Sequence, residues 1–104
     1  MIRFTTYELK CTLDEQATVG VTEAIVSIKQ DTVIITKKLS DGDVSITRNL
    51  LTCSLSQEET GQFVSGKKAY IQINLLYSGG DRAATEIKAI DNVTENLIPR
   101  VVEG

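Results

Sequence analysis

Residues 50–89, LLTCSLSQEETGQFVSGKKAYIQINLLYSGGDRAATEIKA, decide the fold of this chain. The stretch opens with apolar residues that alternate with Thr and Ser, at Leu51, Cys53 and Leu55. An alternation with a period of two is typical of a strand that buries one face. We therefore predict a strand here, and the rest of the stretch predicts a helical turn followed by a long hairpin.

The helical turn is predicted immediately after this strand. Ser56 is a good N-cap, and Glu59, three residues later, can accept a hydrogen bond from the Ser56 N–H in return. Glycines on the C-terminal side keep the turn short, so we expect it near residues 57–62. Phe63 is the large apolar residue of this segment, and we expect its ring to plug one end of the core.

The apolar faces of the hairpin that follows define its register. The first strand carries one such face at Ala69, Ile71, Ile73, Leu75 and Tyr77, and the second at Ala83, Thr85, Ile87 and Ala89. A slip of one residue would turn one of these faces to solvent. A three-residue loop, Gly79–Asp81, avoids the slip and pairs Leu75 with Thr85. It also pairs Ile73 with Ile87, and its glycines supply the positive φ that such a loop needs.

Shorter alternating segments predict the remaining strands, over residues 7–13, 24–28, 33–35 and 44–46. A two-residue turn at Gln30-Asp31 would pair Ile28 with Val33. We predict an all-β fold, an antiparallel β-sandwich of about seven strands that is immunoglobulin-like and has one short helical turn. Residues 1–104 are expected to form one such domain, with a less regular C-terminal tail from about residue 92.

Composition narrows the classes of partner. The 104 residues carry a net charge of −3, which disfavours a nucleic-acid partner. No window is long and apolar enough for a membrane span, and the first residues do not have the pattern of a signal peptide. We therefore expect no membrane partner, and a cytosolic setting at least until assembly or release.

No group of residues favours catalysis. The sequence contains no His, the commonest general base and metal ligand. Asp41 and Asp43 flank a turn glycine, and the acidic pair Glu58-Glu59 suits a helix N-terminus. Cys11 and Cys53 fall at inward positions of two strands, where we expect buried free thiols, with a disulfide as the alternative. We expect no enzymatic activity, no cofactor and no metal site.

An ordered set of residues resembles small proteins encoded in the tail or baseplate region of bacteriophages and prophages. It comprises Ile28-Lys29-Gln30, Val33, Lys37-Lys38, Leu55-Ser56-Gln57-Glu58-Glu59-Thr60, Phe63, Ile71-Gln72-Ile73, Gly80, Arg82, Ala84-Thr85 and Ile87. The resemblance covers most of the chain from about Ala24 to Leu97 and is weakest in the first strand. It implies an immunoglobulin-like or baseplate-docking sandwich with a structural role, and it brings no catalytic residues.

From this resemblance we predict a non-enzymatic phage or prophage structural protein, a tail, baseplate or accessory virion component. Its partners would be further copies of itself, in a homo-oligomer, or other virion proteins, and it would lie in the virion or in the host cytoplasm during assembly. Two alternatives stay open. One is a carbohydrate- or receptor-binding sandwich module, which would need exposed aromatic residues, and the other is an intracellular phage regulatory protein.

Four apolar residues form a candidate interface. In the predicted register, Ile25 and Ile34 project from the outer face of the second and third strands and lie diagonally across the pair. Leu76 and Ile90 project from the outer side of the long hairpin. Because an outer face is normally polar, these residues predict a surface for self-association or docking. The alternatives are cover by the C-terminal tail and scattered exposure without any partner.

Overall fold

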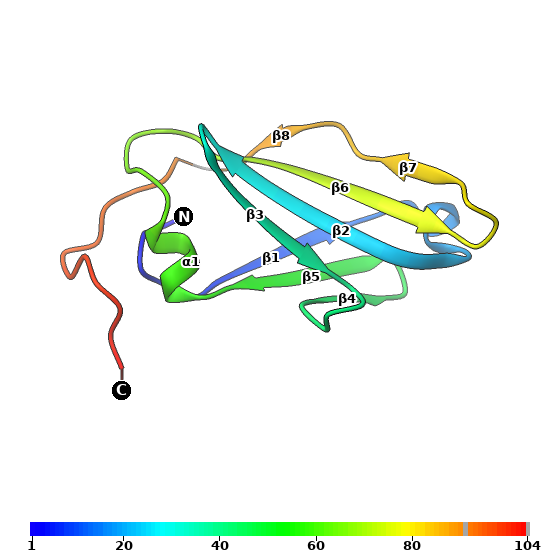
Figure 1. Ribbon diagram of the computed structural model, residues 1–104, viewed down its shortest axis with the longest axis horizontal. Helices are drawn as coiled ribbons and strands as arrows, with labels where there is room; N and C mark the ends of the chain where they lie inside the picture. Colours follow the sequence, from blue (N-terminus) through cyan, green and yellow to red (C-terminus); the bar gives the residue numbers. More distant parts are fainter. Residues whose placement is uncertain (91, 104) are drawn as a thin grey trace.

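A computed structural model describes residues 1–90 and 92–103 of the chain. The protein is an all-β sandwich of antiparallel sheets, as the sequence predicts, with eight strands among the described residues (Figure 1). The elements in chain order are β1 (Tyr7–Thr12), the 3-10 turn η1 (Glu15–Thr18), β2 (Val21–Gln30), β3 (Val33–Lys38), β4 (Val44–Thr47), β5 (Leu50–Leu55), α1 (Gln57–Gly61), β6 (Tyr70–Tyr77), β7 (Arg82–Ala84) and β8 (Lys88–Ala89).

The strands form two sheets that share one core. The smaller sheet has the order β1-β5-β4, and the larger has the order β3-β2-β6, with β7 and β8 both paired to the remaining side of β6. Inward side chains of both sheets meet between them. The largest fully buried ones include Phe63, Ile28, Leu51, Leu55, Ile73, Val26 and Val93.

The predicted helical turn is confirmed in place and in mechanism. Ser56 Oγ accepts a hydrogen bond from the Glu59 N–H at 3.2 Å, and Glu59 Oε1 accepts one from the Ser56 N–H at 2.9 Å. These reciprocal bonds satisfy N–H groups that a helix start leaves without intrahelical partners. Phe63 follows the turn with no exposed surface, so its predicted position in the core is also confirmed.

The hairpin between β2 and β3 has a register two residues away from the predicted one. Gln30 pairs with Val33 and Ile28 with Ile35, so the two-residue turn is Asp31-Thr32 instead of Gln30-Asp31. Asp31 has a φ of 52°, a left-handed conformation that Asp adopts more readily than most residues. A shift of two residues preserves the alternation of faces, so the residues that were predicted to face the core still do so.

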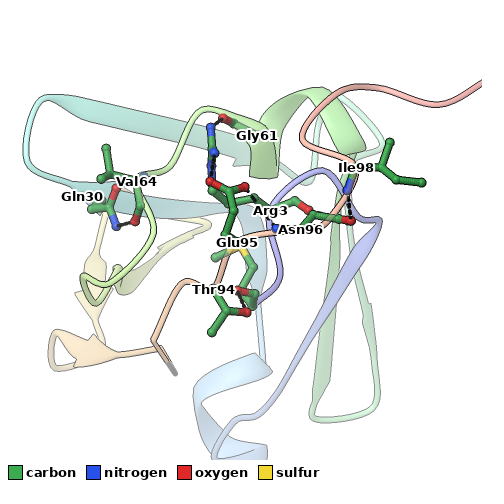
Figure 2. A network of polar contacts seen from close by, with 9 residues as sticks. Arg3, Gln30, Gly61, Val64, Thr94, Glu95, Asn96 and Ile98 are labelled. Atoms are coloured by element: carbon green, nitrogen blue, oxygen red, sulfur yellow. Dashed lines mark hydrogen bonds and ion pairs between the residues drawn. The ribbon is translucent and has the colours of Figure 1, made fainter.

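Gln30 explains why the strand continues through this position. Its side chain is 2% exposed and turns inward, where it meets the loop after α1 (Figure 2). Gln30 Oε1 accepts a hydrogen bond from the Val64 N–H at 2.6 Å, and Nε2 donates to Val64 O at 2.8 Å. A buried amide with both ends paired holds Gln30 in the strand, out of the turn.

The long hairpin has the predicted loop length at a different position. The Tyr77 N–H donates to Asp81 O at 3.0 Å, so the three loop residues are Ser78–Gly80 and not Gly79–Asp81. Leu75 accordingly faces Ala83, and the predicted pairing of Leu75 with Thr85 is wrong. The two loop glycines have φ values of 99° and 95°, the conformation for which glycine was expected.

Beyond β7 the outer strand of this hairpin contains a bulge. Leu75 pairs with Ala83 but Ile71 pairs with Lys88, so one extra residue lies on the outer strand. Thr85 interrupts the ladder, because its Oγ1, in place of its carbonyl, accepts the Ile73 N–H at 3.0 Å. The extra residue reverses the faces, and Ile87, which was predicted to face Ile73 in the core, is 65% exposed.

A small polar network joins the two ends of the chain, which we call the N-terminal clasp (residues 1–3 with 94–96). Ile2 forms a parallel bridge with Thr94, and Arg3 Nη1 lies 2.7 Å from Glu95 Oε2. The second guanidinium nitrogen donates to a backbone carbonyl at the end of α1, and Asn96 Nδ2 donates to Arg3 O at 3.0 Å (Figure 2). The clasp fixes the point from which the C-terminal tail leaves the domain.

Candidate functional site

One side of the sandwich is open between the sheets. On this side β1 is the edge strand of the smaller sheet, and β7 and β8 form the edge of the larger one. Between them lies an apolar groove with a volume of about 510 Å³, which we call the edge groove. Its floor includes Leu9, Leu13, Ile71, Ile73, Leu75 and Ile90. The volume falls within the range of sites that bind ligands in other proteins.

The groove exists because the outer strand of the long hairpin does not close it. Ile73 lines the groove, and the residue predicted to cover it, Ile87, points away from the core. β7 is only three residues long, and its inward residue, Ala83, supplies a single methyl group. The bulge at Thr85 thus leaves apolar surface uncovered that a regular strand would have buried.

The first rim of the groove is a strand edge with free backbone groups. The Leu13 N–H donates to Asn49 O at 2.7 Å, in register with the pairing of β1 and β5. Hydrogen bonding alternates along an antiparallel pair, so the N–H and C=O groups of Glu8, Lys10 and Thr12 point away from β5. Within the described residues β1 pairs with β5 alone, and these groups face no other strand, although Cys11 Sγ donates to Thr12 O at 3.9 Å.

The second rim has the same character over a shorter length. The bond from the Tyr77 N–H to Asp81 O sets the alternation in β7, so the backbone groups of Arg82 and Ala84 point away from β6. Unpaired edges of this kind are templates for pairing with another chain, and proteins usually cover or blunt them. The edge groove therefore combines an apolar floor with two strand edges.

Charged residues of both signs line the rims. The β1 rim carries Lys10 and Asp14, and the opposite rim carries Glu86 and Lys88. Figure 1 shows that β1 runs in the opposite direction to β7 and β8. A segment that followed the groove antiparallel to β1 would therefore meet an acidic residue before a basic one on both rims.

Three of the four residues predicted to form an interface, Ile25, Ile34 and Leu76, lie on the outer face of the larger sheet, and the fourth, Ile90, does not. Ile34 is 59% exposed and Ile25 and Leu76 are partly exposed, but Ile90 is only 7% exposed and belongs to the core. The prediction that Ile90 projects from the outer face is wrong, because the extra residue at Thr85 reverses the faces beyond it. The predicted diagonal contact between Ile25 and Ile34 is also wrong, since in the observed register each faces a lysine.

A partly buried ion pair lies where α1 meets β3. Lys37 Nζ is 2.7 Å from Glu59 Oε2, and the two side chains are 14% and 23% exposed. Burial alone would raise the pKa of Glu59, but hydrogen bonds from Lys37 and Ser56 outweigh it and leave the pKa below its ordinary value. Burial would lower the pKa of Lys37, and the Glu59 carboxylate raises it instead. The pair is explained by the capping of α1 and suggests no reaction.

The two cysteines are free thiols in different environments. Cys53 is 2% exposed, as predicted, and burial raises the pKa of its thiol. Cys11 is only partly buried and lines the edge groove, so its predicted burial is wrong. In residues 1–90 and 92–103 no three His, Cys, Asp or Glu side chains are grouped so that they could hold a metal ion. The helices in this part of the chain include none that could cross a membrane.

No protein-family model matches this sequence, and no curated protein matches it significantly. The resemblance to phage tail and baseplate proteins therefore stays a prediction. The features that bear on function are the edge groove, its two free strand edges and its charged rims.

Proposed function

We propose that this chain is a non-enzymatic structural component of a bacteriophage or prophage particle, in the tail, the baseplate or an accessory position. It acts through protein–protein contacts in the virion and, before assembly, in the host cytoplasm. The edge groove carries the proposal, because its apolar floor and unpaired strand edges lie together on one side of the domain. An extended segment of a partner protein satisfies both features at once by adding a strand.

The C-terminal tail (residues 97–103) supports the proposal from the other side of such a contact. It extends away from both sheets (Figure 1), and its backbone pairs with the Gln57 amide at Val102. Its exposed apolar side chains are Leu97 at 102%, Ile98 at 50%, Val101 at 43% and Val102 at 43%. Four large apolar residues exposed in one short segment are typical of a segment that is covered in an assembly.

Mass spectrometry of purified particles tests this function directly. Cells that carry the gene would be induced to release particles, which are purified by density gradient and stripped of loosely bound protein with high salt. We expect the chain in intact particles, at a copy number comparable with that of other tail or baseplate proteins. Its absence from particles, with the protein abundant in the same lysate, would contradict the proposal.

A glycan array provides a second, independent test. The exposed aromatic residue of the larger sheet is Tyr70, at 48%, and a carbohydrate-binding module would need such residues for stacking on sugars. We expect no specific glycan signal from the purified chain. Tight and specific binding that Tyr70→Ala abolishes would instead favour a carbohydrate- or receptor-binding module.

A further inference from the structure

We infer that the edge groove binds the C-terminal tail of a second copy of this chain, which enters as an extra strand beside β1. The inference rests on the proposed function, since it names the partner that the groove serves. The groove lacks a covering strand, and the tail is an apolar segment outside any sheet. One copy therefore carries both an open groove and a segment that could fill a groove, but the two are not in contact within that copy.

The tail and the groove match in length and in pattern. Residues 97–102 span about 20 Å when extended, and the groove follows β1 and continues past its end to Leu13, Asp14 and Ala17. In an extended chain Leu97, Pro99 and Val101 share one face, which can pack on the apolar floor, and Glu103 follows on the same face at the end of the tail. The opposite face carries Arg100, which stays in water.

Pro99 determines which side of the tail can form hydrogen bonds. Proline has no N–H, so the edge of the tail that includes Pro99 pairs poorly with a strand. The other edge carries the N–H and C=O groups of Ile98, Arg100 and Val102. β1 offers three residues with free backbone groups and β7 offers two, so the complete edge of the tail pairs with β1 and Pro99 faces β7.

The charges of the tail select its direction. Arg100 precedes Glu103 along the tail. On the rim formed by the outer strand of the hairpin, a tail that runs antiparallel to β1 meets Glu86 before Lys88, so Arg100 and Glu103 each lie near a charge of opposite sign there. A parallel tail would bring like charges together, which is unfavourable. The tail therefore enters antiparallel to β1.

The same charges select the register. One register that keeps the apolar face inward sets Arg100 opposite Lys10, which brings two positive charges together. A shift of two residues in one direction would set Arg100 against Glu8, a carboxylate that already pairs with Lys10 at 3.3 Å. The opposite shift keeps the same face inward and places Arg100 opposite Thr12, between Lys10 and Asp14. In this register Val101 lies opposite Cys11, and both side chains point into the groove. Because the tail uses its other edge for hydrogen bonds, these two residues form a non-hydrogen-bonded pair, whose Cα atoms are about 4.5 Å apart.

Such a contact joins different surfaces of two copies. The tail leaves the domain beside the N-terminal clasp, whereas the groove lies between β1 and the outer strand of the long hairpin. A contact between two unlike surfaces repeats from copy to copy and forms either a ring or an open chain. Both are assemblies that a particle component can use.

A disulfide trap tests the register. Val101→Cys should form a disulfide with Cys11 of the next copy under mild oxidation, giving dimers and longer ladders on a non-reducing gel that revert to monomer on reduction. The matched control is Val102→Cys, whose side chain would point away from the groove and should give no ladder. A disulfide closed within one chain, or ladders of equal strength from both variants, would overturn the inference.

Sedimentation velocity measures the contribution of the apolar face. The average mass of the parent protein should rise with concentration. Leu97→Ser combined with Val101→Ser should raise the dissociation constant more than about a hundredfold, since two apolar side chains lose their burial. Ile98→Ser, on the outward face, should change it less than about threefold. A parent that stays monomeric at high concentration, or an Ile98→Ser effect as large as that of the double variant, would overturn the inference.

A mixing experiment separates donor from acceptor. Ala83→Trp should plug the groove without leaving a cavity, because Ala83 faces inward and is exposed. Its matched control is Ala84→Trp, whose side chain lies on the outer face. The plugged variant and the Leu97→Ser, Val101→Ser variant should each be monomeric, and their mixture should form one-to-one dimers and nothing larger. A mixture without dimers overturns the inference.

The outcomes distinguish this inference from the proposed function. One outcome is that particles contain the chain while the tail and groove variants associate like the parent. That result would support the proposed function and contradict the inference. If particles lack the chain but the disulfide ladders and one-to-one mixed dimers form, the inference is supported and the proposed function is contradicted.

Discussion

Replacing Gln30 by Met should destabilise the protein, because Gln30 joins the β2–β3 hairpin to the loop after α1. Its buried side chain makes hydrogen bonds of 2.6 and 2.8 Å with the backbone of Val64, and a longer one of 3.3 Å to Lys67 O. Met has a similar length but forms none of them. At a net value of about 1 kcal/mol for each of the two short bonds, we expect to lose about 2 kcal/mol of unfolding free energy.

Calorimetry and urea denaturation measure this loss. In a domain of this size about 1 kcal/mol corresponds to about 4–8 °C, so Gln30→Met should melt about 10 °C below the parent. The matched control is Gln72→Met, which removes one hydrogen bond, to Thr85 O, from a partly exposed position and should cost less than about 1 kcal/mol. If Gln30→Met melted within about 2 °C of the parent, the Gln30 side chain would not be packed inside. That result would instead favour the two-residue turn at Gln30-Asp31 that the sequence predicts.

Replacing Gln30 by Glu adds a dependence on pH. The carboxylate would still accept the Val64 N–H, but its second oxygen would face carbonyl oxygens and could not donate. Burial and these carbonyls would raise the folded-state pKa above the unfolded value, so the destabilisation grows as pH rises from the unfolded pKa through the folded pKa. The gap in melting temperature between variant and parent should therefore be larger at pH 7 than at pH 4. A gap that is constant with pH would refute this reasoning.

Three other predictions concern the core, the ion pair and the thiols. Phe63→Ala should lower the unfolding free energy by about 3–5 kcal/mol because the ring is fully buried, and a loss below about 1 kcal/mol in urea would contradict its packing. The lowered pKa of Glu59 stabilises the fold above its unfolded value of about 4.3, and this stability is lost as pH falls through the folded value. Glu59→Gln, which cannot titrate, should show a smaller loss in acid than the parent, and identical acid profiles would show that the contact with Lys37 is immaterial. At low protein concentration Cys11 should react with a thiol reagent much faster than Cys53, and equal rates would mean that the groove is closed.

The sequence predicts the inward faces of the strands better than it predicts their registers. The alternation of apolar residues places Val26 and Ile28 inside whether Ile28 pairs with Val33 or with Ile35. The choice between these registers depends on the buried amide of Gln30, whose partners lie more than thirty residues away. A local pattern contains no record of such a contact.

The edge groove was not predicted, and the reason lies in the outer strand of the long hairpin. The alternation of Ala83, Thr85 and Ile87 predicts a regular strand that covers Ile73. The Thr85 hydroxyl replaces a backbone carbonyl as the acceptor in the ladder, and this shifts the faces of the strand by one residue. A pattern of apolar residues does not indicate such a hydrogen bond. The weak apolar character of the segment is the one available signal, since Ala83 and Thr85 are small for a strand that must close a core. The candidate interface failed at Ile90 for the same reason.

The N-terminal clasp has a consequence for the order of events during synthesis. Arg3 contacts Glu95 and Asn96, which follow it by more than ninety residues. These contacts cannot form until Glu95 and Asn96 have left the ribosome, and pairings between residues so far apart in sequence are slow to form. Arg3 must therefore wait for its partners until the strands between them have been synthesised. The tail is made later still, so a copy acquires its tail only when every strand of its body has already been synthesised.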